Sequence, residues 1–153
     1  MGGGRKNFRT TEKGGKRLDK DLVEEWSRGE DRAYLETTGD LHSWEYTDRV
    51  LGLFAHSHLD YHKARDTSEE GQPSLAEMTR QAVTRLKVNK EGFVLVVEGA
   101  RIDHAHHANL PKRSMEETLA MEEAVEVALQ MVDVKDTLVI VTADHSHSVT
   151  ING

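Results

Sequence analysis

The chain has 153 residues and no cysteine, which suits one domain of ordinary size and excludes a disulfide scaffold. Its formal net charge of -7 is spread along the chain without a basic block, which argues against nucleic acid as a partner. No run approaches the roughly 20 apolar residues that span a bilayer, so we expect no transmembrane segment.

The first half of the chain is predicted to be largely irregular. Residues 1–17 are rich in Gly, Lys and Arg and are expected to form a loop. Apolar residues then recur at helical spacing over 18–26, which predicts a helix that Gly29 ends. Residues 30–73 are mostly polar, and short apolar pieces such as 50–54 predict one or two small strands there.

The second half has stronger periodic signals. A Ser-x-x-Glu capping box starts a predicted helix over 74–87. The unbroken β-prone run 93–97 predicts a strand buried on both faces. Amphipathic spacing over 121–132 predicts a long helix, and a second β-prone run at 137–141 predicts another buried strand.

Ligand-type side chains follow both predicted strands. Strand, long helix and strand form a βαβ unit, whose parallel strands end at the same edge of the sheet. Five of the nine histidines lie in the two loops that follow, 98–107 and 142–147, together with three carboxylates. We therefore expect the two loops to face the same space.

These loops carry the residue types of a metal site. Imidazole and carboxylate without thiolate suit zinc, and a carboxylate alone suits magnesium. Asp103 and His107 are four residues apart, so one helical turn would place both on one face. Asp144 and His145 would point to opposite faces of a strand and need a backbone turn to serve neighbouring metals.

The non-functional interpretation stays open for each of these residues taken singly. An isolated His or Asp after a strand often caps a helix, bonds a loop or is simply solvated. The other histidines have no comparable setting, and we interpret them as surface or loop residues: His42, His56, His58 and His62.

The two loops resemble two segments of a known family. The run VEGARIDHAHH at 97–107 resembles the VEGxRIDHxHH segment of animal alkaline phosphatases, and TADHSH at 142–147 resembles their TADHSH segment. A glycine-rich MGGGRK stretch, a GLF turn and a PSLxEM helix start occur in the family's order at 1–6, 52–54 and 73–78. By this resemblance the chain is identified as a member of the alkaline phosphatase family, most similar to arthropod members.

The resemblance implies an α/β fold. We expect a partial three-layer αβα sandwich with a mostly parallel sheet, truncated at both ends. Residues 1–153 would be part of a single catalytic domain, with an irregular and helical part over 1–72 and a metal-ligand part in α-β-α-β order over 73–153. The full-length family members are homodimers, extracellular or attached to the cell surface by a GPI anchor.

The resemblance also implies hydrolysis of phosphate monoesters with two zinc ions and one magnesium ion, through a phosphoserine intermediate. Roles carry over residue by residue. They assign Glu98 to magnesium, Asp103 and His107 to the first zinc, Asp144 and His145 to the second zinc, His104 to the neighbourhood of the bound phosphate, and His147 to orienting Asp103.

The chain departs from the family in what it lacks. In the family, the nucleophilic serine and several other site residues precede the segment that resembles residues 1–6, and one ligand of the first zinc follows the segment that ends at Gly153. We therefore expect a fragment without the nucleophile, inactive in isolation. Two alternatives stay open: a related superfamily phosphodiesterase or phosphomutase, and a non-catalytic metal-binding fragment.

Overall fold

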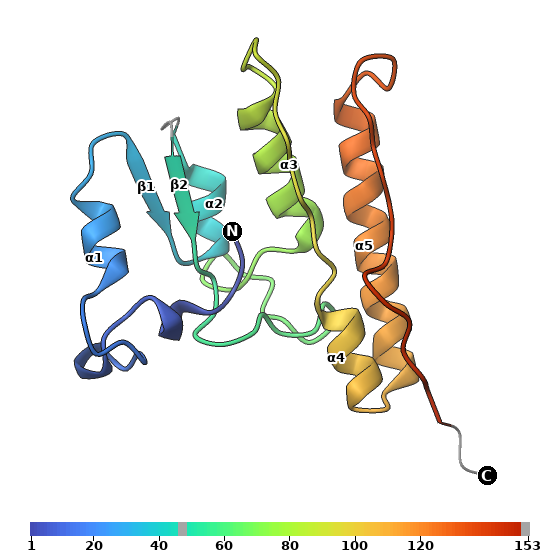
Figure 1. Cartoon of the computed structure of the whole chain (residues 1–153), viewed down its shortest axis with the longest axis horizontal. Helices are drawn as coiled ribbons and strands as arrows, with labels where there is room; N and C mark the ends of the chain where they lie inside the picture. The colour runs from blue at the N-terminus through green and yellow to red at the C-terminus, as the bar shows by residue number, and fades with distance from the viewer. Residues whose placement is uncertain (46–48, 151–153) are drawn as a thin grey trace. The chain divides into compact units, whose positions relative to one another are not determined.

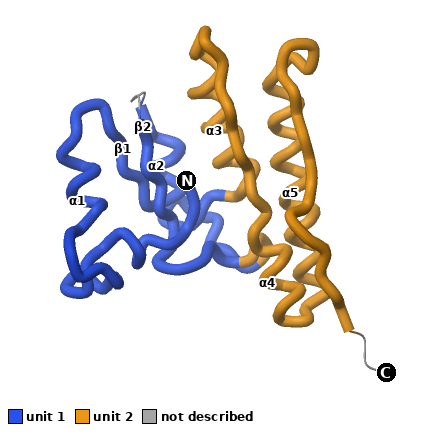
Figure 2. The backbone as a smooth tube through the Cα atoms, in the orientation of Figure 1, with its two compact units in different colours: residues 1–60, 64–73 blue, residues 61–63, 74–153 orange. Residues whose placement is uncertain are grey.

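The computed structural model of the chain describes residues 1–45 and 49–150. The backbone forms two compact units, shown in different colours in Figure 2. The first comprises residues 1–60 and 64–73, and the second comprises residues 61–63 and 74–153. Across the described residues, every helix is too short or too polar to cross a lipid bilayer.

The first unit begins with two short 3₁₀ turns, η1 (Arg5–Asn7) and η2 (Thr11–Lys13), followed by helix α1 (Leu22–Ser27). The predicted helix therefore starts four residues late. The side chain of Asp21 accepts a hydrogen bond from the backbone N–H of Glu24 at 3.0 Å and caps the helix there. Leu18 lies outside the helix and is 91% exposed.

A small parallel β-α-β arrangement forms the centre of this unit (Figure 1). Strand β1 (Arg32–Leu35) pairs in parallel with β2 (Arg49–Gly52), and helix α2 (Thr38–Ser43) lies between them in sequence. The small strands expected within 30–73 are thus confirmed, and the α/β class with them. The apolar core of the unit comprises Val23, Leu35, Leu41, Trp44, Leu53, Phe54 and Ala55.

Helix α2 was not predicted from the sequence. It begins with a capping box in which the Thr37 side chain accepts from the Asp40 N–H at 3.1 Å. The Asp40 carboxylate in turn accepts from the Thr37 N–H at 3.0 Å. Aspartate is less common than glutamate in this role, and the helix has only six residues, so its sequence signal is weak.

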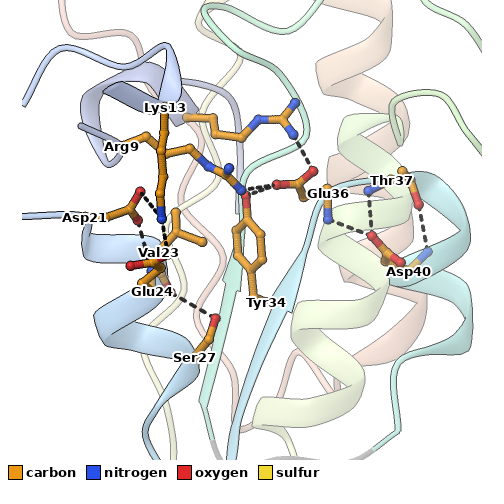
Figure 3. A network of polar contacts seen from close by, with 11 residues as sticks. Arg9, Lys13, Asp21, Val23, Glu24, Ser27, Tyr34, Glu36, Thr37 and Asp40 are labelled. Atoms are coloured by element: carbon orange, nitrogen blue, oxygen red, sulfur yellow. Dashed lines mark hydrogen bonds and ion pairs between the residues drawn. The ribbon is translucent and has the colours of Figure 1, made fainter. Parts of the chain in front are cut away.

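A polar network around Glu36, directly after β1, connects three segments of the first unit (Figure 3). Its carboxylate lies 2.6 Å from Arg5 Nη1 and 2.8 Å from Arg9 Nη2, and the Tyr34 hydroxyl donates to it. Burial alone would raise the pKa of Glu36, but the hydrogen bonds from Tyr34 and Arg5 and the two cationic charges outweigh burial and lower it. Burial and the bond to Glu36 raise the pKa of Tyr34 to about 12.

Within its described residues, the second unit has three helices: α3 (Leu75–Leu86), α4 (Arg101–His107) and α5 (Pro111–Met131). Helix α5 packs against both α3 and α4 (Figure 1). The capping box predicted for α3 is confirmed, with Ser74 and Glu77 bonded to each other's backbone N–H. The long helix is confirmed too, and begins earlier, because Pro111 stands at its first position.

The prediction of two paired strands at 93–97 and 137–141 is wrong. Both runs are unpaired, extended segments (Figure 1). Burial alternates residue by residue over 93–98, as in a strand with one face covered, while Val94 is 90% and Leu138 83% exposed. β-prone side chains favour an extended backbone, but a strand also needs a neighbour to complete its hydrogen bonds, and the described residues place none beside either run.

We predict that Glu36→Gln destabilises the chain by about 2 kcal/mol at pH 7, because Arg5 and Arg9 lose a charged acceptor. The pKa of Glu36 is lowered in the folded state, so its stabilisation is present above the unfolded pKa and is lost as pH falls through the folded pKa. Urea denaturation at decreasing pH should therefore show the difference between variant and parent closing.

Glu25→Gln is the matched control for this experiment. Glu25 pairs with Lys20, and both side chains are more than half exposed. Its loss should change the free energy of unfolding by less than about 0.5 kcal/mol. Equal effects of the two substitutions would contradict the special role given to Glu36.

Candidate metal centre

Helix α4 places Asp103 and His107 on one face. His107 Nε2 lies 3.6 Å from Asp103 Oδ2, as the four-residue spacing predicts. Ala105 on the same helix is completely buried, which marks the side of α4 that faces the interior. The Asp103 side chain remains 38% exposed and that of His107 68% exposed, so both are accessible to an ion.

Residues of the second loop come to this face of α4. His145 Nε2 lies 3.9 Å from Asp103 Oδ1 and 3.3 Å from Asp144 Oδ2. The ring of His147 meets that of His107 edge to face, with centroids 4.5 Å apart. The two loops therefore share a space, as the sequence predicted, although the paired strands expected to bring them together are not formed.

Three of these residues form a group of metal-ligand dimensions. One ligand atom each from Asp103, His107 and His147 lie within 4.8 Å of one another. Ligands of a tetrahedral zinc ion stand about 3.3 Å apart, so small side-chain movements would close the group on an ion. One carboxylate and two imidazoles form a donor set that suits zinc.

A second observation concerns one carboxylate oxygen of Asp103. Its Oδ1 atom is buried and has no hydrogen-bond partner among the described residues. A buried carboxylate oxygen without a donor is costly, and a bound cation would satisfy it. The residues present therefore fit a divalent metal.

The histidine tautomers favour metal binding through Nε2. His145 Nδ1 lies 3.0 Å from the backbone oxygen of Ser146, and His147 Nδ1 lies 2.7 Å from that of Ser148. A carbonyl oxygen only accepts, so each Nδ1 carries the hydrogen and each neutral ring keeps its lone pair on Nε2. The bond to Ser146, followed by the charges of Asp144 and Asp103, raises the pKa of His145.

The remaining predicted site residues are not members of the group of Asp103, His107 and His147. Glu98 is exposed at the end of the extended segment 93–98. His104 lies on α4 with its Nδ1 3.2 Å from Arg101 Nη1, and the Arg101 guanidinium stacks on the Tyr61 ring at 3.8 Å. Asp144 is exposed and reaches the cluster through His145.

Sequence reasoning missed His106 and Ser114. Ser114 Oγ lies 2.5 Å from His106 Nε2, and the His106 ring stacks on that of His147 with centroids 5.4 Å apart. The two residues are eight positions apart and belong to different helices, so no periodicity connects them. The turn between α4 and α5 alone brings them together.

Comparison with known proteins supports the family resemblance along the whole chain. A family model described as alkaline phosphatase matches residues 1–153. The chain is 42% identical to the membrane-bound alkaline phosphatase of Bombyx mori over 167 residues, which covers 100% of this chain and 30% of that protein. It is 45% identical to alkaline phosphatase 4 of Drosophila melanogaster over 108 residues, covering 69% of this chain and 18% of that one.

Solved structures give the same result. The alkaline phosphatase of Thermus thermophilus matches with a TM-score of 0.72 and 35% identity, over 83% of this chain and 26% of that chain. A cold-active alkaline phosphatase from Shewanella sp. matches with a TM-score of 0.68 and 32% identity, over 85% of this chain and 29% of that one. The chain spans about 30% of the length of the Bombyx relative. With a family match over every residue and a common fold, this chain belongs to the alkaline phosphatase family.

Proposed function

We propose that this chain supplies zinc ligands to an enzyme that hydrolyses phosphate monoesters. The observation that carries the proposal is the group of Asp103, His107 and His147, in which a buried oxygen of Asp103 has no hydrogen-bond donor among the described residues. Family membership supports the reaction class. Zinc bound there would polarise a phosphoryl oxygen and lower the pKa of an attacking hydroxyl.

The ligands divide between two neighbouring zinc ions and a magnesium ion in this proposal. Asp103 and His107 hold the first zinc, and Asp144 and His145 hold the second. The 3.9 Å between His145 Nε2 and Asp103 Oδ1 supports adjacent sites, as a two-metal clamp requires. The proposal completes the set with three further roles: Glu98 as a magnesium ligand, His104 near the phosphate and His147 orienting Asp103.

The chain's own residues bind and orient rather than attack in this mechanism. The backbone carbonyls of Ser146 and Ser148 accept from the Nδ1–H groups of His145 and His147, which leaves His145 Nε2 to bind a cation and His147 Nε2 to face Asp103. A serine outside these 153 residues would take up the phosphoryl group and then release it to water. Residues 1–72 and 73–153 would then be parts of one catalytic domain.

The isolated chain would bind zinc weakly and would not turn over. The assignment leaves two ligands for each zinc and one for magnesium, whereas catalytic zinc normally has three protein ligands. The proposed setting of the whole enzyme is a homodimer, extracellular or at the cell surface. Its Bombyx mori relative is named as membrane-bound.

We predict that Asp103→Asn weakens zinc binding by about 100-fold, because the variant loses the anionic ligand of the group. Competition with a chromophoric chelator measures the affinity. Asp31→Asn is the matched control: Asp31 has a positive φ of 54° that asparagine tolerates, and it is not in the ligand group. Unchanged affinity in Asp103→Asn would refute the site.

We also predict that the 153-residue chain, with zinc and magnesium added, does not hydrolyse an aryl phosphate ester above the buffer rate. A chimera in which residues 1–153 replace the matching stretch of the Bombyx mori enzyme should hydrolyse it. The same chimera with Asp103→Asn should lose most of that activity. Phosphate release by the isolated chain would overturn the proposed inactivity, and an inert chimera would count against the phosphatase function.

A further inference from the structure

We propose that Ser114 is a positioning residue for the metal centre. Its hydroxyl is bonded to the ring of His106, and the His106 ring stacks on the ring of His147. The expected effect on zinc affinity rests on the proposed function. The contacts among Ser114, His106 and His147 do not, because all of them lie within the second unit. Neither residue is among those to which the family resemblance assigns a role.

Ser114 and His106 form a bond across the turn between two helices. Ser114 lies in the first turn of α5 and is 5% exposed, while His106 lies in the last turn of α4. Ser114 Oγ and His106 Nε2 lie 2.5 Å apart, within hydrogen-bond distance. The serine hydroxyl is carried on a single rotatable side-chain bond, so this bond restricts the rotamers open to the His106 ring.

His106 then sets the orientation of His147. Their rings stack with 25° between their planes and centroids 5.4 Å apart. The ring of His147 also makes an edge-to-face contact with that of His107. The segment that carries His147 has no regular secondary structure, so these ring contacts supply the constraint that a strand would otherwise give.

A separate contact holds the backbone of the same segment. The Asn109 side chain, in the turn between α4 and α5, donates to the Thr150 backbone oxygen at 2.9 Å and accepts from its N–H at 3.2 Å. These two bonds fix where the segment lies, and the His147 ring is held in addition by its Nδ1–H bond to Ser148 and by its contacts with the rings of His106 and His107. The stack on His106, to which Ser114 is bonded, is therefore one of the contacts that set the orientation of the ring.

The consequence concerns the direction of one nitrogen. His147 donates from Nδ1 to Ser148, so its Nε2 must face Asp103 and His107 for the group to act on a cation. Without the Ser114 hydroxyl, the His106 side chain can adopt further rotamers, and its ring no longer stays stacked on that of His147. The cost should be about threefold to tenfold in zinc affinity, less than the 10–100-fold typical of a partner bonded directly to a ligand.

The test uses three variants of the 153-residue chain. Ser114→Ala removes the hydroxyl, Ser114→Thr retains it, and Thr84→Ala removes an exposed hydroxyl on α3 as the matched control. Zinc affinity is measured by chelator competition, and ligand geometry by the visible absorption of bound Co²⁺. We expect Ser114→Ala to bind zinc about threefold to tenfold more weakly with an altered cobalt spectrum, Ser114→Thr to recover both, and Thr84→Ala to match the parent.

A metal-free measurement separates this inference from the proposed function. Nuclear Overhauser contacts between the His106 and His147 rings should be present in the parent and lost in Ser114→Ala. If the parent binds no zinc, the proposed function fails, and the ring contacts still decide the positioning role. If zinc binds and Ser114→Ala keeps the parent's affinity and ring contacts, the positioning role is overturned. Equal losses in Ser114→Ala and Ser114→Thr would also overturn it, because the hydroxyl would then not matter.

Discussion

The packing of α4 on α5 is the constraint on which the metal centre depends. Helix α4 has seven residues, and isolated helices shorter than about 12 residues are marginal in water. Its stability must therefore come from its neighbour, and the complete burial of Ala105 marks the contact side. Once that side is fixed, helical geometry determines where Asp103 and His107 point.

The two halves of the cluster are held by different physical means. Asp103 and His107 owe their separation to one turn of regular helix, which tolerates little variation. His145 and His147 belong to a segment without regular structure. Hydrogen bonds from their ring nitrogens to backbone carbonyls, together with ring-to-ring contacts, hold these side chains where a β-sheet would otherwise do so. A site assembled in this way combines a rigid half with a half that depends on a few side chains.

The sequence was informative where structure is local and weak where structure depends on distant partners. The capping box at Ser74 and the spacing of Asp103 and His107 act within one helical turn, so both were predictable. The β-prone run at 93–97 indicated its extended backbone but not its pairing, because pairing belongs to the neighbour. The bond between His106 and Ser114 left no pattern, since it arises only when two helices meet.

The unpaired runs at 93–97 and 137–141 have a consequence for the chain in solution. Val94, Val96, Leu138 and Ile140 are each more than 70% exposed, beside backbone edges that accept a further strand. The net charge of -7 opposes the approach of one copy to another. Added salt shortens the range of that repulsion to about 3 Å at 1 M. Copies of the chain should therefore associate more as ionic strength rises.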